Sequence, residues 1–357
     1  MNEIQSYCIA WTRFILSVLV VFIHIPHPSE IGLDFSLYAF ISQGIARVAV
    51  PAFFVISGYL FSIGLEDDWS WPRWWGKVKK RLLTVLIPYL LWNLIFALLI
   101  NVYHFFPINN QFEIGWLPRW LESNDGVWGI FLGWGRDGYV PLNYPLWFMR
   151  DLIVMFLLSP LLFLLLRKTH GLFLYILVIP LIFDWRIPLP GFSTEAILFF
   201  SCGMYCQLKR NELFQPSCRL FKTQLIVLFL LLVLESILYG RLENIALIIR
   251  HLIELVGTPF TFVLLCRYLS LQKWDSDFLT SSSFFLYASH VPFIWSSVIF
   301  PLWINPTLQG QFEGTFAMSS FLLYLILGVV VILFCLLFYL VIYKYMPYTR
   351  KLLCGGR

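Results

Sequence analysis

The stretch WTRFILSVLVVFIHIPHP, which runs from Trp11 to Pro28, places an arginine and a histidine inside an apolar run long enough to enter a membrane. On an α-helix, the chain turns through about 1100° between Arg13 and His24, so both side chains share one face and lie about 16 Å apart. An ionisable group at bilayer depth costs roughly 2.5 to 3.5 kcal/mol, so such groups usually face a protein interior or a wet cavity. Arg13 and His24 are therefore candidate functional residues.

The composition is that of a membrane protein. The chain is 59% hydrophobic and only 13% charged, with a mean hydropathy of +0.78, whereas globular domains carry about 25% charged residues. Its 7 cysteines form no CxxC pair, so the sequence indicates neither a zinc site nor a disulfide framework. We expect an integral membrane protein that binds no metal and no nucleic acid.

Apolar segments of about 20 residues recur along the whole chain and predict an all-α, polytopic fold with about ten transmembrane helices. No soluble domain is expected, so residues 1–357 are interpreted as one membrane-embedded domain. The predicted spans are 8–25, 45–64, 82–104, 144–166, 171–183, 192–208, 222–239, 246–269, 279–300 and 320–346.

The distribution of lysine and arginine predicts the orientation, because positively charged loops stay cytoplasmic. Of the 25 basic residues, 17 follow the even-numbered spans. An even number of spans with both termini in the cytoplasm satisfies this pattern. The absence of disulfide and glycosylation signals is typical of a bacterial inner membrane.

The longest segment predicted outside, residues 105–143, is rich in tryptophan. These side chains either belong to the aromatic belt at the membrane interface or stack on the apolar face of a sugar ring. The residues concerned are Trp116, Trp120, Trp128 and Trp134.

Two further segments carry polar residues suited to a ligand. Arg47 lies at the outer end of the second span, and the Ser57-Gly58 step within it permits either close helix packing or room for an elongated ligand. The cluster KVKKR, residues 77–81, either sets topology only or also holds an anionic, phosphate-bearing ligand at the inner face.

The later spans add more ionisable groups. The segment YPLWFMRDLIV places Trp147, Arg150 and Asp151 at the start of the fourth span, where the last two residues either pair locally or act on a ligand. The segment SSSFFLYASHVPF places His290 in the ninth span. Intramembrane carboxylates are interpreted as structural pairs or as ion-coupled groups; they are Glu195, Glu235 and Glu254.

Other kinds of site are not indicated. His24 and His27 are too few for a metal site, and no third ligand follows at a useful spacing. The sequence contains no nucleophile elbow and no Walker A motif, which argues against an ATP-driven pump.

Five segments, taken in order, give the chain a resemblance to a known family. They are Arg13 and His24 in R-x10-H spacing, VPAFFVISGYLF, LLTVLIPYLLW, PLWFMRDLI and SSFFLYASHVPF. This chain resembles the membrane-bound acyltransferase-3 family over nearly its whole length, with the strongest agreement in the first 160 residues.

The resemblance implies transfer of an acyl group, usually acetyl from cytosolic acetyl-CoA, to a hydroxyl of a surface polysaccharide or its lipid-linked precursor. It implies Arg13 and His24 as the catalytic pair. The sequence departs from the family pattern at Thr84, where many relatives carry the second arginine of an R-x-x-R motif. We expect no C-terminal esterase-like domain of the kind that some relatives carry.

We therefore assign two further groups of residues. Those expected to contact the acyl-CoA donor are Lys77, Lys80, Arg81, Ser57 and Gly58. Those expected to contact the acceptor glycan are Arg47, Trp147, Arg150, Asp151 and His290.

The chemistry of the two catalytic candidates agrees with this activity. Acyl transfer to a sugar hydroxyl needs a base, and histidine, with an ordinary pKa of about 6.5, suits that role near neutral pH. Arg13 is suited to steady the donor or the developing oxyanion. A covalent acyl-histidine intermediate and direct transfer both stay open.

Two alternatives predict different essential residues. A gradient-driven exporter of a glycan or other solute requires the intramembrane carboxylates but not His24. A non-catalytic membrane scaffold tolerates conservative replacement of both Arg13 and His24.

Overall fold

The computed structural model describes residues 3–25, 36–65, 69–105, 126–134, 139–185, 187–214, 220–271, 274, 276–296 and 320–356. Within these ranges every regular element is a helix, so the all-α prediction is confirmed for the described residues. The longer helices are α1 Glu3–His24, α3 Ala49–Ser62, α4 Trp71–Phe105, α7 Trp147–Lys168, α9 Thr194–Leu208, α10 Phe221–Leu238, α11 Glu243–Leu271, α12 Asp277–Ser296 and α15 Ser320–Tyr345. The shorter ones are α2 Leu37–Ala39, η1 Phe40–Gly44, η2 Ile45–Val48, α6 Gly126–Leu132, η4 Tyr144–Leu146, α8 Leu172–Ile182 and α16 Pro347–Cys354.

Helices occupy all ten ranges that the sequence predicted as spans. Among the described residues, 7 helical segments are long and apolar enough to cross a membrane. The helix α8 is a shorter apolar helix of 11 residues, and α9 has 15 residues. The chain is thus an integral membrane protein, while the count of ten spans, the single domain and the cytoplasmic placement of both termini stay predictions.

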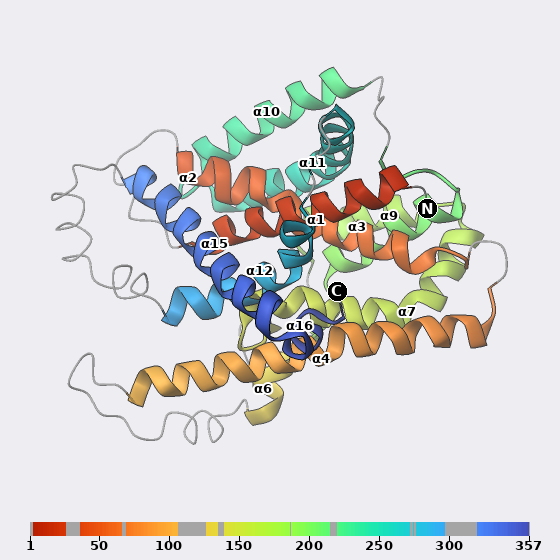
Figure 1. Cartoon of the computed structure of the whole chain (residues 1–357). Helices are drawn as coiled ribbons and strands as arrows, with labels where there is room; N and C mark the ends of the chain where they lie inside the picture. The colour runs from red at the N-terminus through yellow and green to blue at the C-terminus, as the bar shows by residue number, and fades with distance from the viewer. Residues whose placement is uncertain are drawn as a thin grey trace.

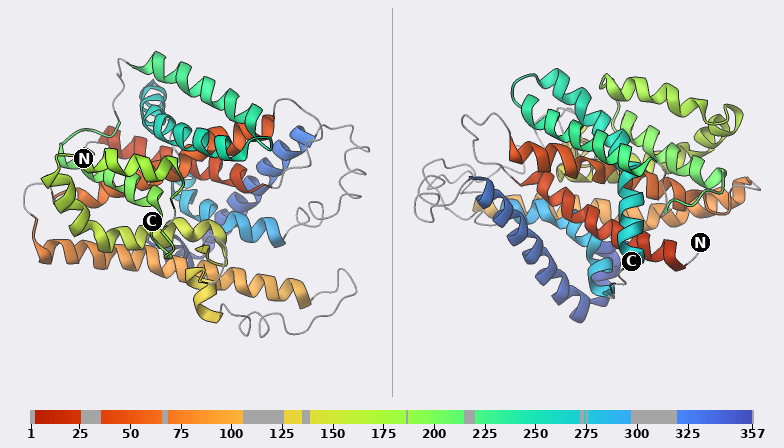
Figure 2. Two further views of the ribbon diagram at one scale, coloured as in Figure 1. Left: turned by 180° about the vertical axis from the view of Figure 1, so that it is seen from behind. Right: turned by 90° about the horizontal axis from the view of Figure 1, so that it is seen from above.

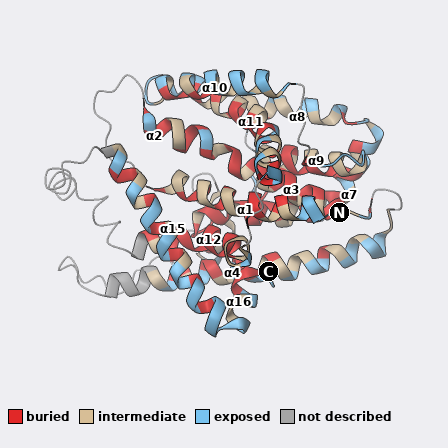
Figure 3. Cartoon of the chain, turned by 45° about the horizontal axis from the view of Figure 1, so that its top comes forward, coloured by how far each residue is buried: buried red, intermediate tan, exposed pale blue. Residues whose placement is uncertain are grey.

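The helices form a bundle with a buried centre and an apolar outside. In Figure 1, α1, α3, α7 and α9 run across the middle of the bundle, α4 lies along one side and α10 along the opposite side, and Figure 2 shows the same order from behind. Figure 3 shows α1, α3 and α12 largely buried, whereas α10 and α15 carry many exposed residues. These exposed positions are largely apolar, including Leu225, Ile226, Phe229 and Leu230 on α10 and Val330, Leu333, Phe334 and Leu337 on α15. Such a surface is suited to lipid rather than to water.

Helices α3 and α9 pack backbone to backbone at two glycines. A Cβ atom added at Gly58 would lie 2.1 Å from the carbonyl oxygen of Phe200, and one added at Gly203 would lie 2.0 Å from that of Val55. Only hydrogen fits at these positions, as is usual where small residues let membrane helices approach closely. The Gly58 step therefore holds the bundle together.

The second span begins earlier in the structure than the sequence predicted. Helical structure starts at Leu37, not near residue 45, and passes through a π-helical turn at Phe40–Gly44 and a 3₁₀ turn at Ile45–Val48 before α3. Gly44 leaves the helical region, with φ −102° and ψ −91°. A Cβ atom there would lie 2.5 Å from Leu232 Cδ2 of α10. Turns of this kind within helices are frequent at functional sites, and this one carries Arg47.

The C-terminal residues form a helix, α16, that the sequence analysis did not predict. The indole Nε1 of Trp92 on α4 donates to the carbonyl of Leu353 over 3.1 Å. Gly355, just beyond the helix, lies against the backbone of Thr84, because a Cβ atom there would be 2.0 Å from the Thr84 oxygen. Both contacts hold α16 against α4, as Figure 1 also shows.

Candidate active site

Two histidines meet at the end of α1. The His24 ring stacks on the His290 ring of α12, with 5.2 Å between centroids and 23° between planes. The Tyr144 ring of η4 meets His24 edge-on, with centroids 5.0 Å apart. His290 is fully buried and His24 is half-buried. The sequence analysis chose the two histidines from separate motifs, and the structure places them side by side.

The hydrogen bonds around His290 fix its tautomer. Its Nδ1 lies 2.7 Å from the carbonyl oxygen of Tyr287. A carbonyl only accepts, so Nδ1 carries the proton and Nε2 of the neutral ring keeps its lone pair. Within the described residues, Nε2 is buried and has no hydrogen-bond partner. The Tyr287 hydroxyl donates to the carbonyl of Pro145, which ties this turn of α12 to η4.

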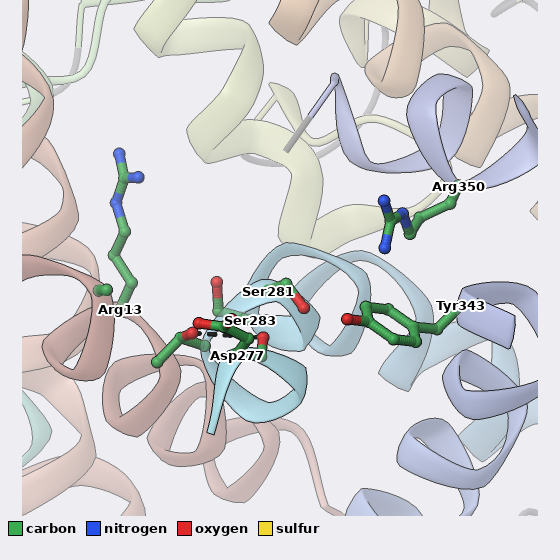
Figure 4. A pocket seen from close by; sticks show the side chains of 8 residues that line it. Arg13, Asp277, Ser281, Ser283, Tyr343 and Arg350 are labelled. Atoms are coloured by element: carbon green, nitrogen blue, oxygen red, sulfur yellow. Dashed lines mark hydrogen bonds between the residues drawn. The ribbon is translucent and has the colours of Figure 1, made fainter. Parts of the chain in front are cut away.

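Arg13 lies at a different place on α1, beside a cavity of about 330 Å³. Arg13 and Arg350 approach this cavity from opposite sides, with hydroxyl side chains of α12 between them (Figure 4). The labelled lining residues are Arg13, Asp277, Ser281, Ser283, Tyr343 and Arg350. A second cavity of about 340 Å³, beside the N-terminal turns of α1, shares Ala10, Asp277 and Thr280 with the first.

A narrow cavity lies beside Arg13 and is also lined by Tyr287 of α12. Its volume is about 40 Å³, and Arg13 and Ser283 line both it and the first cavity. Ser57 and Tyr287 also line it, and Tyr287 is the residue whose carbonyl holds His290. Arg13 and Ser17 of α1 thus share this cavity with the hydroxyl groups of Ser57, Ser283 and Tyr287.

The basic cluster of α4 does not line the cavities around Arg13. Lys77 Nζ donates to the carbonyls of Phe61, over 3.1 Å, and Ile63, so it caps the C-terminal end of α3. Lys80 is exposed and Arg81 is half-buried. The Thr84 hydroxyl donates to the carbonyls of Lys80 and Arg81 over 3.0 and 3.3 Å.

Ser57 and Gly58, expected together at the donor, lie in different surroundings. Ser57 lines the narrow cavity, whereas Gly58 contacts the backbone of α9. The expected donor contacts of Gly58 and of the basic cluster stay predictions, and we leave them out of the site proposed below.

Three of the expected acceptor residues line one cavity of about 470 Å³. They are Trp147, Arg150 and Asp151 at the start of α7. Aromatic and carboxylate side chains join them, and the whole set suits a polyhydroxylated ligand, since carboxylates accept hydrogen bonds from hydroxyls and ring faces cover apolar C–H groups. The added residues are Tyr139, Asp184, Phe192, Glu195 and His251.

The Arg150–Asp151 pair has a structural role. Both side chains are buried, and Arg150 Nη2 lies 2.7 Å from Asp151 Oδ1. Arg150 Nη1 also donates to the carbonyls of Leu132, over 2.8 Å, and Tyr139. Asp151 Oδ2 accepts from the Ser193 backbone over 3.3 Å. The pair therefore anchors the segments on two sides of the cavity.

Arg47 does not line this cavity, but it interacts with residues of both sites. Its Nε donates to Gln43 Oε1 over 3.1 Å, which orients the guanidinium within the irregular turn. Arg47 lies within electrostatic range of His24 and of Glu195. The positive charge thus lies near both the catalytic candidate and the acceptor candidates.

Part of the cavity lined by Trp147, Arg150 and Asp151 was not expected from the sequence. Asp184 and His251 were not chosen as site residues, and Glu195 was interpreted only as a structural or ion-coupled group. Arg250, the residue before His251, bonds instead to Glu235 over 2.6 Å and to Glu243 over 3.0 Å. Only the fold shows which neighbours each of these two side chains meets.

Two earlier expectations are not tested by these contacts. Within the described ranges no group of three or more His, Cys, Asp or Glu side chains is placed to hold a metal ion, and metal independence stays a prediction. Trp116 and Trp120, considered for sugar stacking, lie outside the described residues, whereas Trp128 and Trp134 are exposed.

Comparison with known proteins identifies the family to which the chain belongs. Residues 6–340 match the family model Acyl_transf_3, described as an acyltransferase domain. A protein of Rhizobium meliloti (strain 1021), the succinoglycan biosynthesis protein ExoH, is 32% identical over 208 residues, which are 55% of this chain and 52% of that protein. The chain thus matches about half the length of this curated relative. No solved structure matches the chain significantly.

The family match covers the helices that carry both histidines, Arg13 and the cavity lined by Trp147. Its last residue, 340, lies within α15, so α16 falls beyond the matched part. The chain is a member of the acyltransferase-3 family.

Proposed function

We propose that this protein transfers an acyl group, most simply acetyl, from cytosolic acyl-CoA to a hydroxyl of a cell-surface polysaccharide or its lipid-linked precursor, in a bacterial inner membrane. The family supports an acyltransferase, and the name of the Rhizobium relative associates that relative with biosynthesis of a polysaccharide. The observation that carries the proposal is the placement of Arg13 and its cavities at one part of α1 and of the stacked His24 and His290 at its other end.

In this reaction the acceptor oxygen attacks the thioester carbonyl carbon, so that a C–O bond forms and the C–S bond breaks. His24 takes the hydroxyl proton, which passes to the leaving thiolate, and the products are the ester and the free CoA thiol. His290, oriented by the bond of its Nδ1 to the Tyr287 carbonyl, lies against His24. Direct transfer and transfer through an acyl-histidine intermediate have the same overall substrates and products.

The acceptor is proposed to bind in the cavity lined by Trp147, Asp184 and Glu195. Arg47 lies near both Glu195 and His24, so it is suited to stabilise negative charge that develops on the carbonyl oxygen. Arg150 and Asp151 hold the cavity in shape through their buried bonds.

Substitution Trp147→Ala tests this acceptor site. We expect KM for the glycan to rise about tenfold, equivalent to about 1.4 kcal/mol, because a ring face of the cavity is lost. KM for acyl-CoA should stay unchanged, and steady-state kinetics with each substrate varied separately would measure both. Trp71→Ala is the matched control, since Trp71 is 64% exposed on α4. An unchanged glycan KM in Trp147→Ala would remove this cavity from the acceptor site.

The experiment that tests the activity uses membranes that contain the protein, extracted surface glycan, and labelled acetyl-CoA or succinyl-CoA in parallel. We expect alkali-labile label in the glycan with one of the two donors. No label with either donor, from protein shown to be folded, would contradict the proposal.

An exporter remains the second candidate because two carboxylates are buried without full pairing. Glu235 is 0% and Glu254 is 5% exposed, and Oε2 of each has no hydrogen-bond partner in the described part of the chain. An exporter that lacks these acids should leave the glycan inside the cell. An acyltransferase that lacks His24 should still deliver glycan to the surface, but without its ester groups.

A further inference from the structure

The cavity beside Arg13 combines two cations with several hydroxyl groups. Arg13 comes from α1, Arg350 comes from α16, and Ser281 and Ser283 come from α12 (Figure 4). Arginine guanidinium groups with neighbouring hydroxyls are suited to bind phosphate oxygens, often with two parallel hydrogen bonds. Asp277 is the carboxylate on this cavity, and two arginines leave the lining with net positive charge.

Arg350 packs on an aromatic ring and keeps one buried donor without a partner among the described residues. Its guanidinium lies over the Tyr343 ring, 4.7 Å from the centroid. Its Nε is buried and has no hydrogen-bond partner among the described residues. A buried donor without a partner is costly, so a ligand acceptor in the cavity would remove this cost.

The position of Arg350 depends on contacts between α16 and α4. The bond from Trp92 to Leu353 and the close approach of Gly355 to Thr84 fix the C-terminal end of the helix. Val85, next to Thr84, lines the narrow cavity together with Arg13. The C-terminal helix thus brings a cation to the part of the bundle where Arg13 lies.

The adjoining cavity offers a different chemistry. Its lining combines Tyr7, Trp11 and Trp274 with the carboxylates Glu3 and Asp277, and Trp274 is 37% exposed. Aromatic faces of this kind suit a purine base. A charged cavity that continues into an aromatic one matches a nucleotide, in which phosphates adjoin a base.

We infer that Arg350 of the C-terminal helix binds a phosphate group of the CoA portion of the donor, opposite Arg13. This inference rests on the proposed function, because it assigns part of the donor site. It also gives α16, which lies beyond the family match, a defined role as part of that site.

The test measures binding of CoA, without an acyl group, to purified protein in phosphatidylcholine nanodiscs by calorimetry. For Arg350→Ala we expect Kd to rise about tenfold, whereas Arg350→Lys should show a smaller rise because it keeps a point charge. Lys351→Ala is the matched control, since Lys351 is the next residue and is exposed. Thermal unfolding of each variant checks that α16 stays packed.

Each possible result either supports or overturns the assignment of Arg350 to the CoA site. An equal Kd in wild type and Arg350→Ala would overturn the assignment of Arg350 and leave the proposed function standing. If Arg350→Ala keeps its CoA affinity but loses bound phosphatidylglycerol from mixed nanodiscs, the cavity holds a lipid headgroup instead. Wild-type protein that binds no CoA would overturn the donor class and this inference together. A rise in Kd confined to Arg350 variants supports the inference.

Discussion

Replacement of His24 by alanine is expected to reduce acyl transfer by about 10² to 10⁴-fold, the usual contribution of a positioned acid or base. His24 is the half-buried member of the stacked pair, whereas His290 is fully buried and has its Nδ1 occupied by the carbonyl of Tyr287. Removing the imidazole leaves the acceptor hydroxyl without its base. Label transfer from acyl-CoA to glycan, at matched protein abundance in the membrane, measures the effect.

The matched control is His170→Asn. His170 is exposed and its backbone is in the left-handed region, with φ 52°, which asparagine tolerates. This variant should keep wild-type activity. Acyl transfer that survives His24→Ala would remove His24 from the catalytic site.

Substitution Gly58→Val is expected to abolish accumulation of folded protein. The new Cβ atom would lie 2.1 Å from the Phe200 oxygen and 3.2 Å from the Met204 nitrogen, so α3 and α9 would have to separate. Overpacking that a side chain can relieve costs about 1 to 3 kcal/mol, and here the obstacle is backbone. Fluorescence-detected size-exclusion chromatography of detergent-extracted protein would show the loss.

Gly76→Ala is the control for this prediction, because no atom lies within 4 Å of a Cβ at Gly76. Alanine in that exposed helical position should be neutral or should stabilise by up to about 1 kcal/mol. A normal monodisperse peak from Gly58→Val would show that α3 and α9 do not pack as described.

The sequence predicted the helices and the shared face of α1 because both depend on local patterns. Apolar runs of membrane length define helices directly, and the spacing of Arg13 and His24 fixes their relative direction on one helix. Which neighbours that face meets depends on packing between distant segments, so the pairing of His24 with His290 and Tyr144 emerges only from the fold.

Ser57 and Gly58 illustrate the same limit. Adjacent residues on a helix point about 100° apart, so one lines the narrow cavity and the other contacts α9. The sequence analysis treated them as one motif because periodicity gives relative directions on a helix, not the identity of the neighbouring element.

The helix α16 was missed although local signals for it are present. Pro347 stands at its first position and Gly355, with φ 66°, follows its end, which is the usual arrangement of these residues at helix ends. A helix of 8 residues is too short to cross a membrane, so the pattern of apolar runs did not indicate it. As a result, Arg350 was counted only as a topology signal.

The central claim is that an acyl group passes from a donor near Arg13 to an acceptor near His24, across the bundle. The most direct test uses sealed proteoliposomes with labelled acyl-CoA outside and glycan acceptor enclosed inside. The account predicts label in the enclosed glycan, and none when His24 is replaced by alanine. Label that appears only when donor and acceptor are on the same side of the membrane would contradict it.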